Sequence, residues 1–333
     1  MTIARNAERD KAAAAPPPQE FFRRHVLDLD DFSSEEIEQV LTTAGAMKEV
    51  LGRRIRKVPT LRGRTIVTLF LEASTRTRAS FEQAGKVLSA DVINLSGSES
   101  SVKKGESLVD TAKTLEAMGA DVLVMRHPMS GAPNLVARAT GLRVVNAGDG
   151  WHAHPSQALL DLFTIRQRLG RVEGLTVLIV GDILHSRVAR SNIWGLTKLG
   201  ARVILCGPPT LMPSQALAAF AAAGERLSIE PDLVRAIPQA DVIMTLRLQQ
   251  ERMAAGLLPS LREYAELYQI NDQRLARAKP TALVMHPGPM NAGVEISHEV
   301  AHGARSLVET QVANGVAVRM AILYLLAATG EDA

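Results

Sequence analysis

The stretch FLEASTRTRASFE, from Phe70 to Glu82, decides the fold, because two different residue patterns meet in it. An apolar run from Thr65 to Leu71 leads into the polar residues Ser74 to Arg78, and an amphipathic run from Ala79 to about Leu88 follows. This order predicts a strand, a loop and a helix. Three hydroxyls and two guanidiniums are therefore expected at the N-terminus of a helix.

Residues 74–78 are typical of a site for a phosphate group. Backbone N–H groups at a helix N-terminus point towards a ligand, and the helix dipole favours an anion. Arginine adds a planar fork of donors that suits phosphate oxygens. The alternative is an ordinary N-cap, for which a single Ser or Thr hydroxyl is enough. Three hydroxyls with two arginines favour anion binding.

Apolar and amphipathic runs alternate along the rest of the chain. The expected strands are Thr65–Leu71, Asp91–Leu95, Val122–Met125, Val144–Asn146, Thr176–Val180, Arg202–Leu205, Val242–Thr245 and Ala282–Met285. The expected helices include Glu35–Leu51, Leu108–Met118, Pro155–Leu169, Arg187–Leu199, Gln215–Ala223 and about Thr310–Ala328. This alternation predicts an α/β protein with two doubly wound domains, each a parallel sheet flanked by helices.

The pattern falls into two similar halves, with a break near Ala153–Gln157. Residues 1–20 are rich in Ala and Pro and are expected to form a disordered tail. The first domain is expected to comprise residues 21–153 together with the last helix, within 310–333, which packs back on it. The second domain is expected to comprise residues 154–309.

Composition excludes several classes of function. Aromatic residues are only 4% of the chain, and the net charge of +3 is dispersed, so we expect no nucleic acid partner. We find no apolar stretch of membrane-spanning length and no signal peptide, and therefore expect a cytoplasmic protein without a membrane partner. The single cysteine, Cys206, lies in an apolar run and is expected to be a core residue.

Polar clusters follow five of the expected strands, where parallel sheets bind their ligands. These clusters are Arg126-His127-Pro128, the run from Gly148 to Gln157, Gly181 to Arg187, Leu246 to Arg252, and His286 to Pro289. Taken singly, a strand-end arginine is often part of a surface salt bridge, and a lone histidine is often structural. Five clusters that each close a strand indicate one shared site.

Two other kinds of site are not supported. The run VLIVGDILHSR has the order of a nucleotide-binding turn but lacks the G-x-G-x-x-G glycines. His152 and His154 have no further ligand at a convincing spacing, so no metal and no cofactor are expected. The surplus of cations, without an obvious carboxylate base, instead favours substrates with several negative charges and catalysis by positioning and electrostatic stabilisation.

The chain resembles the carbamoyltransferases, and among them the aspartate carbamoyltransferases. Eight motifs carry the resemblance, in the family's order: FLEASTRTR (70–78), SSVKKGES (100–107), MRHP (125–128), NAGDG (146–150), HPSQALLD (154–161), GDILHSR (181–187), RLQQER (247–252) and HPGP (286–289). The resemblance covers the chain from about Phe21 to Ala328. It implies transfer of a carbamoyl group from carbamoyl phosphate to the α-amine of L-aspartate, a step of pyrimidine synthesis, with the first domain binding carbamoyl phosphate and the second binding aspartate.

The resemblance also implies the site residues, carried over position by position. Carbamoyl phosphate would be bound by Ser74, Thr75, Arg76, Thr77, Arg126, His154, Gln157, Gly288 and Pro289. Aspartate would be bound by Lys104, Arg187, Arg247 and Gln249. The catalytic residues would be Arg76, Thr77, Lys104, Arg126 and His154. Ser100 and Lys104 would come from the adjacent subunit of a homotrimer.

Their implied roles differ. Arg76 would neutralise charge on the leaving phosphate, while Thr77, Arg126 and His154 would polarise the carbamoyl oxygen. Gln157 would hold the carbamoyl amide, together with the backbone carbonyls of Gly288 and Pro289.

One departure from the family pattern concerns partners. Many members have Leu-Pro-Arg after His-Pro, whereas this chain has Gly288-Pro289-Met290. The Gly-Pro form is familiar in chains that work without the allosteric regulatory subunit, so the resemblance favours an unregulated trimer or an assembly with dihydroorotase. Two other functions stay open: an ornithine or related carbamoyltransferase, whose His-Cys-Leu-Pro motif is absent here, and a catalytically silent subunit of a pyrimidine-pathway complex.

Overall fold

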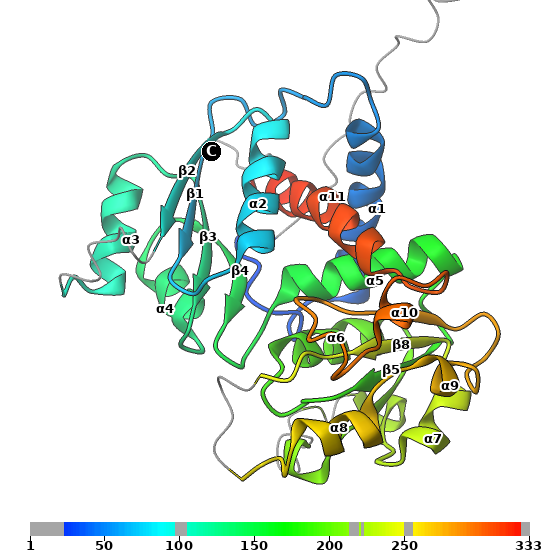
Figure 1. Cartoon of the computed structure of the whole chain (residues 1–333). Coiled ribbons are helices and arrows are strands. Elements are labelled where there is room, and N and C mark those ends of the chain that lie inside the picture. The colour runs from blue at the N-terminus through cyan, green and yellow to red at the C-terminus, as the bar shows by residue number, and fades with distance from the viewer. Residues whose placement is uncertain (1–22, 97–104, 213–219, 221–222, 250–255, 328–333) are drawn as a thin grey trace, which may run out of the picture.

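Two parallel sheets, each covered by helices, make up the computed structural model of the chain (Figure 1). The structure describes residues 23–96, 105–212, 220, 223–249 and 256–327. The α/β class and the two doubly wound domains predicted from the sequence are confirmed.

The first sheet has the strand order β2-β1-β3-β4. Its strands are β1 (Thr65–Phe70), β2 (Asp91–Ser96), β3 (Val122–His127) and β4 (Arg143–Asp149). The second sheet has the order β7-β6-β5-β8-β9. Its strands are β5 (Thr176–Val180), β6 (Arg202–Cys206), β7 (Leu227–Ile229), β8 (Val242–Thr245) and β9 (Leu283–Met285). All the pairings between these strands are parallel.

Helices connect the strands and close both sheets. The α-helices are α1 (Ser34–Leu51), α2 (Thr75–Val87), α3 (Leu108–Ala117), α4 (Ala132–Ala139), α5 (Pro155–Leu169), α6 (Arg187–Lys198), α7 (Leu233–Ala236), α8 (Leu261–Tyr268), α9 (Asp272–Leu275), α10 (His298–Ala301) and α11 (Val308–Ala327). Two short 3₁₀ helices are η2 (Pro209–Leu211) and η4 (Ile237–Gln239).

Successive strand residues face opposite sides of a sheet, and both sides are buried in inner strands such as β1 and β5, whereas the edge strands β2 and β7 are partly exposed. In β1, Ile66 and Phe70 belong to the core formed with α1, α2 and α11, whereas Val67 and Leu69 face α3 and α4. In β5, Val177 belongs to the core shared with α5 and α6, and the next residue faces α7 to α10. One core is therefore continuous between the two sheets, with α5 and α11 at the junction (Figure 1).

The chain reverses its direction of strand addition once in each sheet. From β1 the chain adds β2 on one side and β3 on the other, and from β5 it adds β6 on one side and β8 on the other. Open α/β sheets bind ligands beyond the carboxyl ends of the strands at such a reversal. The topology therefore points to the segments that follow β1, β3, β5 and β8.

Several predicted boundaries need correction. Helix α2 begins at Thr75, so residues 75–78 form its first turn and not a loop before it. The sequence patterns missed β7, a short edge strand whose residues are partly exposed. The predicted helix Gln215–Ala223 falls mostly outside the described residues.

The expectation that no stretch reaches membrane-spanning length is wrong for α11, which is long and apolar enough by composition. Within the protein, 78% of its apolar window is buried. The helix contacts α1, α2 and α5. A helix buried on all sides is apolar on all sides, so its position in the core accounts for its composition.

Candidate active site

The N-terminus of α2 lies at the carboxyl end of β1 and has no side-chain cap. Ser74 has the extended backbone of an N-cap residue, but its side chain makes no capping hydrogen bond, and the first turn carries no acidic residue. The first N–H groups of a helix have no partner within the helix. Thr77 is buried and Arg76 is exposed. This geometry favours the predicted anion site over the ordinary N-cap.

Arg76 is in close contact with the loop that follows β9. A Cβ atom built on Gly288 would lie 2.7 Å from the Arg76 guanidinium, and the φ of Gly288 is +64°. A side chain at this position would be strained and would also displace the arginine. Gly288 therefore lets a loop of the second domain approach the phosphate segment of the first.

Glu72 joins an arginine from each half of the chain. Its carboxylate accepts a hydrogen bond from Arg126 Nη2 at 2.6 Å, and Arg187 Nη1 donates to Oε2 at 3.1 Å. Both arginines have little exposed surface. Because each guanidinium is held in a charge-assisted contact, Glu72 fixes the two cations side by side. Both arginines were predicted site residues, whereas Glu72 was not.

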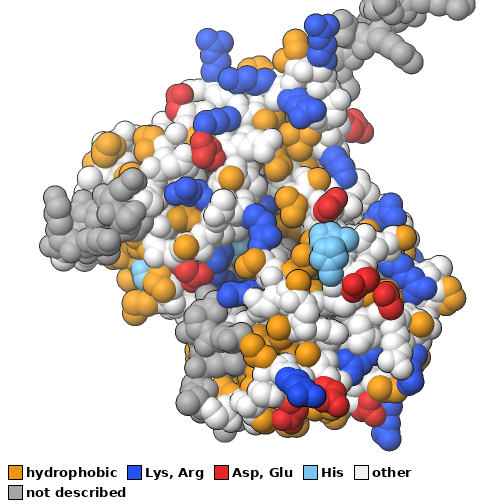
Figure 2. All heavy atoms as spheres, in the orientation of Figure 1, with side chains coloured by type: hydrophobic (Ala, Val, Ile, Leu, Met, Phe, Trp, Pro, Cys, Tyr) orange, Lys and Arg blue, Asp and Glu red, His pale blue; other side chains and the backbone are white. Residues whose placement is uncertain are grey.

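Gly148 lets the same two guanidiniums lie against β4. Its φ is +115°, and a Cβ there would lie 3.0 Å from Arg187 Cζ and 3.2 Å from Arg126 Nη1. Arg126 Nη1 also donates to the backbone oxygen of Ala147 at 3.2 Å. Figure 2 shows Lys and Arg side chains gathered in the middle of one face, where the two halves of the molecule meet.

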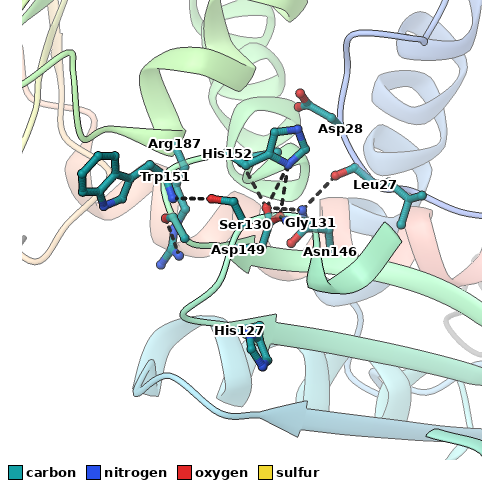
Figure 3. A network of polar contacts seen from close by, with 12 residues as sticks. Leu27, Asp28, His127, Ser130, Gly131, Asn146, Asp149, Trp151, His152 and Arg187 are labelled. Carbon is teal, nitrogen blue, oxygen red and sulfur yellow. Dashed lines mark hydrogen bonds and ion pairs between the residues drawn. The ribbon is translucent and has the colours of Figure 1, made fainter. Parts of the chain in front are cut away.

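Asp149 organises the loop between β4 and α5. Its carboxylate accepts hydrogen bonds from the backbone of Gly131 at 2.6 Å, from Asn146 Nδ2 at 2.7 Å and from the backbone of Ala153 at 3.1 Å. His152 Nδ1 lies 3.1 Å from the same carboxylate (Figure 3). These contacts fix the conformation of the loop that leads into α5, whose N-cap residue is His154.

His154 is buried and uncharged. Burial and the nearby cationic arginines lower the pKa of its imidazole well below the usual range. Its backbone N–H donates to Ser191 Oγ at 2.9 Å, and that hydroxyl donates to Asp28 at 2.7 Å. The neutral ring can offer one N–H to a ligand oxygen without adding charge.

In the second sheet, Asp182 links the loops after β5 and β8. It accepts a hydrogen bond from the backbone N–H of Gln249 at 3.4 Å, and His185 Nδ1 lies 2.8 Å from Oδ1. The ring of Trp151, from the β4–α5 loop, packs edge-on against the ring of His185, with 4.7 Å between the ring centroids. The loops that carry Arg187 and Gln249 are thus tied together and to the first domain.

Most of the predicted site residues lie in segments that follow the carboxyl ends of strands in the two sheets. The described members are Ser74, Thr75, Arg76, Thr77, Arg126, His154, Gln157, Arg187, Arg247, Gln249, Gly288 and Pro289. Ser100 and Lys104 lie outside the described residues. The carboxylates that hold these groups were not predicted: they are Glu72, Asp182 and Asp161, which accepts a hydrogen bond from Gln157 Nε2 at 3.0 Å. Glu72 and Asp182 each lie two residues beyond a strand, which is the signal that identified the arginines.

Known proteins share this arrangement. Residues 24–167 match the family model described as "Aspartate/ornithine carbamoyltransferase, carbamoyl-P binding domain". Residues 173–326 match the one described as "Aspartate/ornithine carbamoyltransferase, Asp/Orn binding domain". The "aspartate carbamoyltransferase catalytic subunit" of Roseiflexus sp. (strain RS-1) is 65% identical over 304 residues, which are 91% of this chain and 95% of the relative.

Solved structures agree at lower identity. The crystal structure of aspartate transcarbamoylase from Trypanosoma cruzi in complex with carbamoyl phosphate and aspartate has a TM-score of 0.82 and 34% identity, and covers 91% of this chain and 95% of its own. Ornithine carbamoyltransferase from Pyrococcus furiosus has a TM-score of 0.81 and 30% identity, with 91% and 96% covered. By its two domain matches and by identity along nearly its whole length, the chain belongs to the aspartate/ornithine carbamoyltransferase family.

Proposed function

We propose that the chain transfers the carbamoyl group of carbamoyl phosphate to the α-amine of L-aspartate, giving N-carbamoyl-L-aspartate and phosphate. The observation that carries the proposal is the pairing of an open, cationic helix N-terminus after β1 with a second set of cationic side chains after β5 and β8. The 65% identical relative is an aspartate carbamoyltransferase, and the Trypanosoma cruzi structure holds both substrates.

The phosphate end of the first substrate is assigned to Ser74, Thr75, Arg76, Thr77 and Arg126. Hydroxyls, N–H groups of the first turn of α2 and two guanidiniums all donate to phosphate oxygens. Arg76 is the residue that stabilises the charge growing on the leaving phosphate, which is an effect on the transition state more than on binding.

The carbamoyl oxygen is assigned to Thr77, Arg126 and His154. Donors placed around this oxygen stabilise the tetrahedral intermediate that forms when the amine attacks. Since His154 is neutral, it acts as a hydrogen-bond donor, and the departing phosphate accepts the proton of the amine. Gln157 and the backbone carbonyls of Gly288 and Pro289 hold the carbamoyl amide.

The two carboxylates of aspartate are assigned to Arg187, Arg247 and Gln249, with Lys104 from the adjacent subunit. Glu72 fixes Arg187 beside Arg126, which places a donor for aspartate next to a donor for the carbamoyl group. An amine held beside the carbamoyl carbon reacts as if intramolecularly.

Ornithine is the second candidate for the amine, because the matching structural neighbour from Pyrococcus furiosus acts on it by name. Ornithine ends in a cation, which two arginines would repel. The test measures phosphate released from carbamoyl phosphate with aspartate, with ornithine and with neither. Release with aspartate alone supports the proposal, release with ornithine alone overturns it, and no release with either amine supports a silent subunit.

We further propose that the chain forms a cytoplasmic homotrimer that works in pyrimidine synthesis and can assemble with dihydroorotase. In this trimer, Ser100 and Lys104 of the neighbouring subunit complete each active site. Arg76→Ala and Lys104→Ala trimers should each be nearly inactive. When the two are dissociated and reassembled together, some interfaces pair an intact Arg76 with an intact Lys104, so activity should return. Mixed trimers that form but remain inactive would exclude a contribution of Lys104 across the interface.

A further inference from the structure

Asp161 holds three side-chain amides although it lies one helical turn beyond the residues assigned to the substrate. Its Oδ1 accepts hydrogen bonds from Gln157 Nε2 at 3.0 Å and from Gln311 Nε2 at 2.8 Å. Its Oδ2 accepts one from Asn192 Nδ2 at 2.9 Å. The carboxylate is fully buried, and the donors come from α5, α6 and α11.

An ionised carboxylate can only accept hydrogen bonds. Burial raises the pKa of Asp161 to about 6, so the group is ionised at pH 8. Each amide that touches it must therefore present its nitrogen. The oxygen of Gln157 is consequently directed away from Asp161, at the other end of the amide.

A carbamoyl group differs from an acetyl group in carrying NH₂ where acetyl carries CH₃. An amide oxygen can accept a hydrogen bond from NH₂. An amide nitrogen in the same place could not, because it would bring two hydrogen-bond donors face to face. The orientation of Gln157 therefore decides which of two acyl phosphates of nearly the same shape is favoured.

We propose that Asp161 is a positioning residue that fixes the orientation of Gln157 and thereby makes the site selective for an acyl phosphate bearing NH₂ over acetyl phosphate. The inference rests on the proposed function, because it takes Gln157 to contact the carbamoyl amide.

The same carboxylate also supports the other segment assigned to that amide. Gln311, oriented by Asp161, uses its oxygen to accept the backbone N–H of His286 at 2.9 Å. His286 Nδ1 in turn accepts the N–H of Gly288 at 2.8 Å, and its Nε2 lies 3.2 Å from Glu295. With its N–H directed back to His286, Gly288 can use only its carbonyl towards a ligand. Asp161 thus orients two acceptors for one NH₂ group. It orients the side-chain oxygen of Gln157 directly, and the carbonyl of Gly288 through Gln311 and His286.

The test measures, by titration calorimetry at pH 8, the dissociation constants of carbamoyl phosphate and acetyl phosphate for the wild-type protein and three variants. Asp161→Leu keeps a similar volume and removes the acceptor. We expect its preference for carbamoyl phosphate to fall by roughly 10- to 100-fold, as when a buried polar group is left without its hydrogen-bond partner. Its affinity for acetyl phosphate, which does not need the acceptor, should stay within about threefold.

Asp161→Asn is the conservative variant. Its oxygen can face Gln157 and Gln311. Its nitrogen can face Asn192 once the Asn192 amide turns over, which replaces the donor Nδ2 with Oδ1, an atom without a hydrogen-bond partner among the described residues. This variant should keep the preference within about threefold. Asn192→Ala is the matched control, because it removes a donor to the same carboxylate on the side away from Gln157, and it should also keep the preference.

A folded Asp161→Leu protein that keeps the wild-type preference would overturn the inference, and so would loss of the preference in Asp161→Asn. If the leucine variant does not fold, Asp161→Ser replaces it, since the shorter side chain leaves the acceptor out of reach of Gln157. A wild-type protein that makes no carbamoyl-aspartate contradicts the proposed function, whereas an active wild type with an unchanged leucine variant contradicts only the role of Asp161.

Discussion

Helices α1 and α2 both follow a serine N-cap, yet only one of the two serines caps its helix. Ser33 accepts the N–H of Glu36 at 3.2 Å, and Glu36 accepts the N–H of Ser33 at 2.7 Å, which forms a complete capping box. Ser74 makes no capping hydrogen bond. The first turn of α1 contains Glu35 and Glu36, whereas that of α2 contains Arg76 and no acid.

The difference separates two uses of one local structure. At α1 the positive end of the helix is neutralised by side chains of the same helix, so the cap contributes to stability. At α2 the positive end is reinforced by guanidiniums, which favours an anion from outside the helix. Residue type alone does not distinguish the two serines, but the charge of the following turn does.

Arg76→Ala should give the largest effect. It removes the cation next to the leaving phosphate, and we expect kcat to fall by about 10²–10³, the range seen when one donor to a developing oxyanion is lost. The free energy of unfolding should change by less than about 0.5 kcal/mol, because the side chain is exposed. Steady-state kinetics and urea unfolding measure the two quantities. An intact kcat with weak carbamoyl phosphate binding would make Arg76 only an anchor.

Ser74→Ala should lower kcat/KM for carbamoyl phosphate by roughly 10- to 100-fold, since it deletes a hydrogen bond to a charged group. Its free energy of unfolding should be unchanged within about 0.5 kcal/mol, because the hydroxyl caps nothing. Loss of stability with unchanged kinetics would show that Ser74 is an ordinary cap after all.

Inorganic phosphate should stabilise the protein through α2. At ten times its dissociation constant, phosphate that binds only the folded state adds about 1.4 kcal/mol to the free energy of unfolding. The melting temperature, followed by circular dichroism, should rise with phosphate in the wild type and in Ser33→Ala, but much less in Arg76→Ala. Equal stabilisation of all three proteins would place the bound anion elsewhere.

Ser33→Ala should give the smallest and opposite effect. We expect a loss of about 1 kcal/mol in the free energy of unfolding, typical of a deleted N-cap, with kcat and KM unchanged. Chemical denaturation compared with Ser74→Ala is the measurement. Altered kinetics in Ser33→Ala would break the separation between the two helices.

Much of the fold could be predicted because most of its strands are apolar runs, and inner strands such as β1 and β5 are buried on both faces. Such runs ended within three residues of the observed strand ends, the largest difference being at β4. β7 was missed since a three-residue, partly exposed edge strand has no such run. The start of α2 was placed too late because Thr is a weak helix former, and the polar first turn resembled a loop.

The candidate site also has a part that could be predicted from the sequence and a part that could not. The arginines were found because strand order brings the carboxyl ends of parallel strands together. The carboxylates that orient the arginines and amides of the site depend on partners distant in sequence: Glu72 on Arg187, and Asp161 on Gln311. No local pattern marks an acid as the partner of a residue more than a hundred positions away, so only the folded structure identifies these roles.

The position of α11 has a consequence for the synthesis of the protein. A ribosome releases residues 308–327 only after the whole second sheet has been made, yet these residues cover the apolar faces of α1 and α2. The usual order, in which an N-terminal domain folds while the next is being translated, therefore cannot be completed here. The nascent chain carries an unfinished first domain until its last helix emerges, and that interval is when it most needs protection from aggregation.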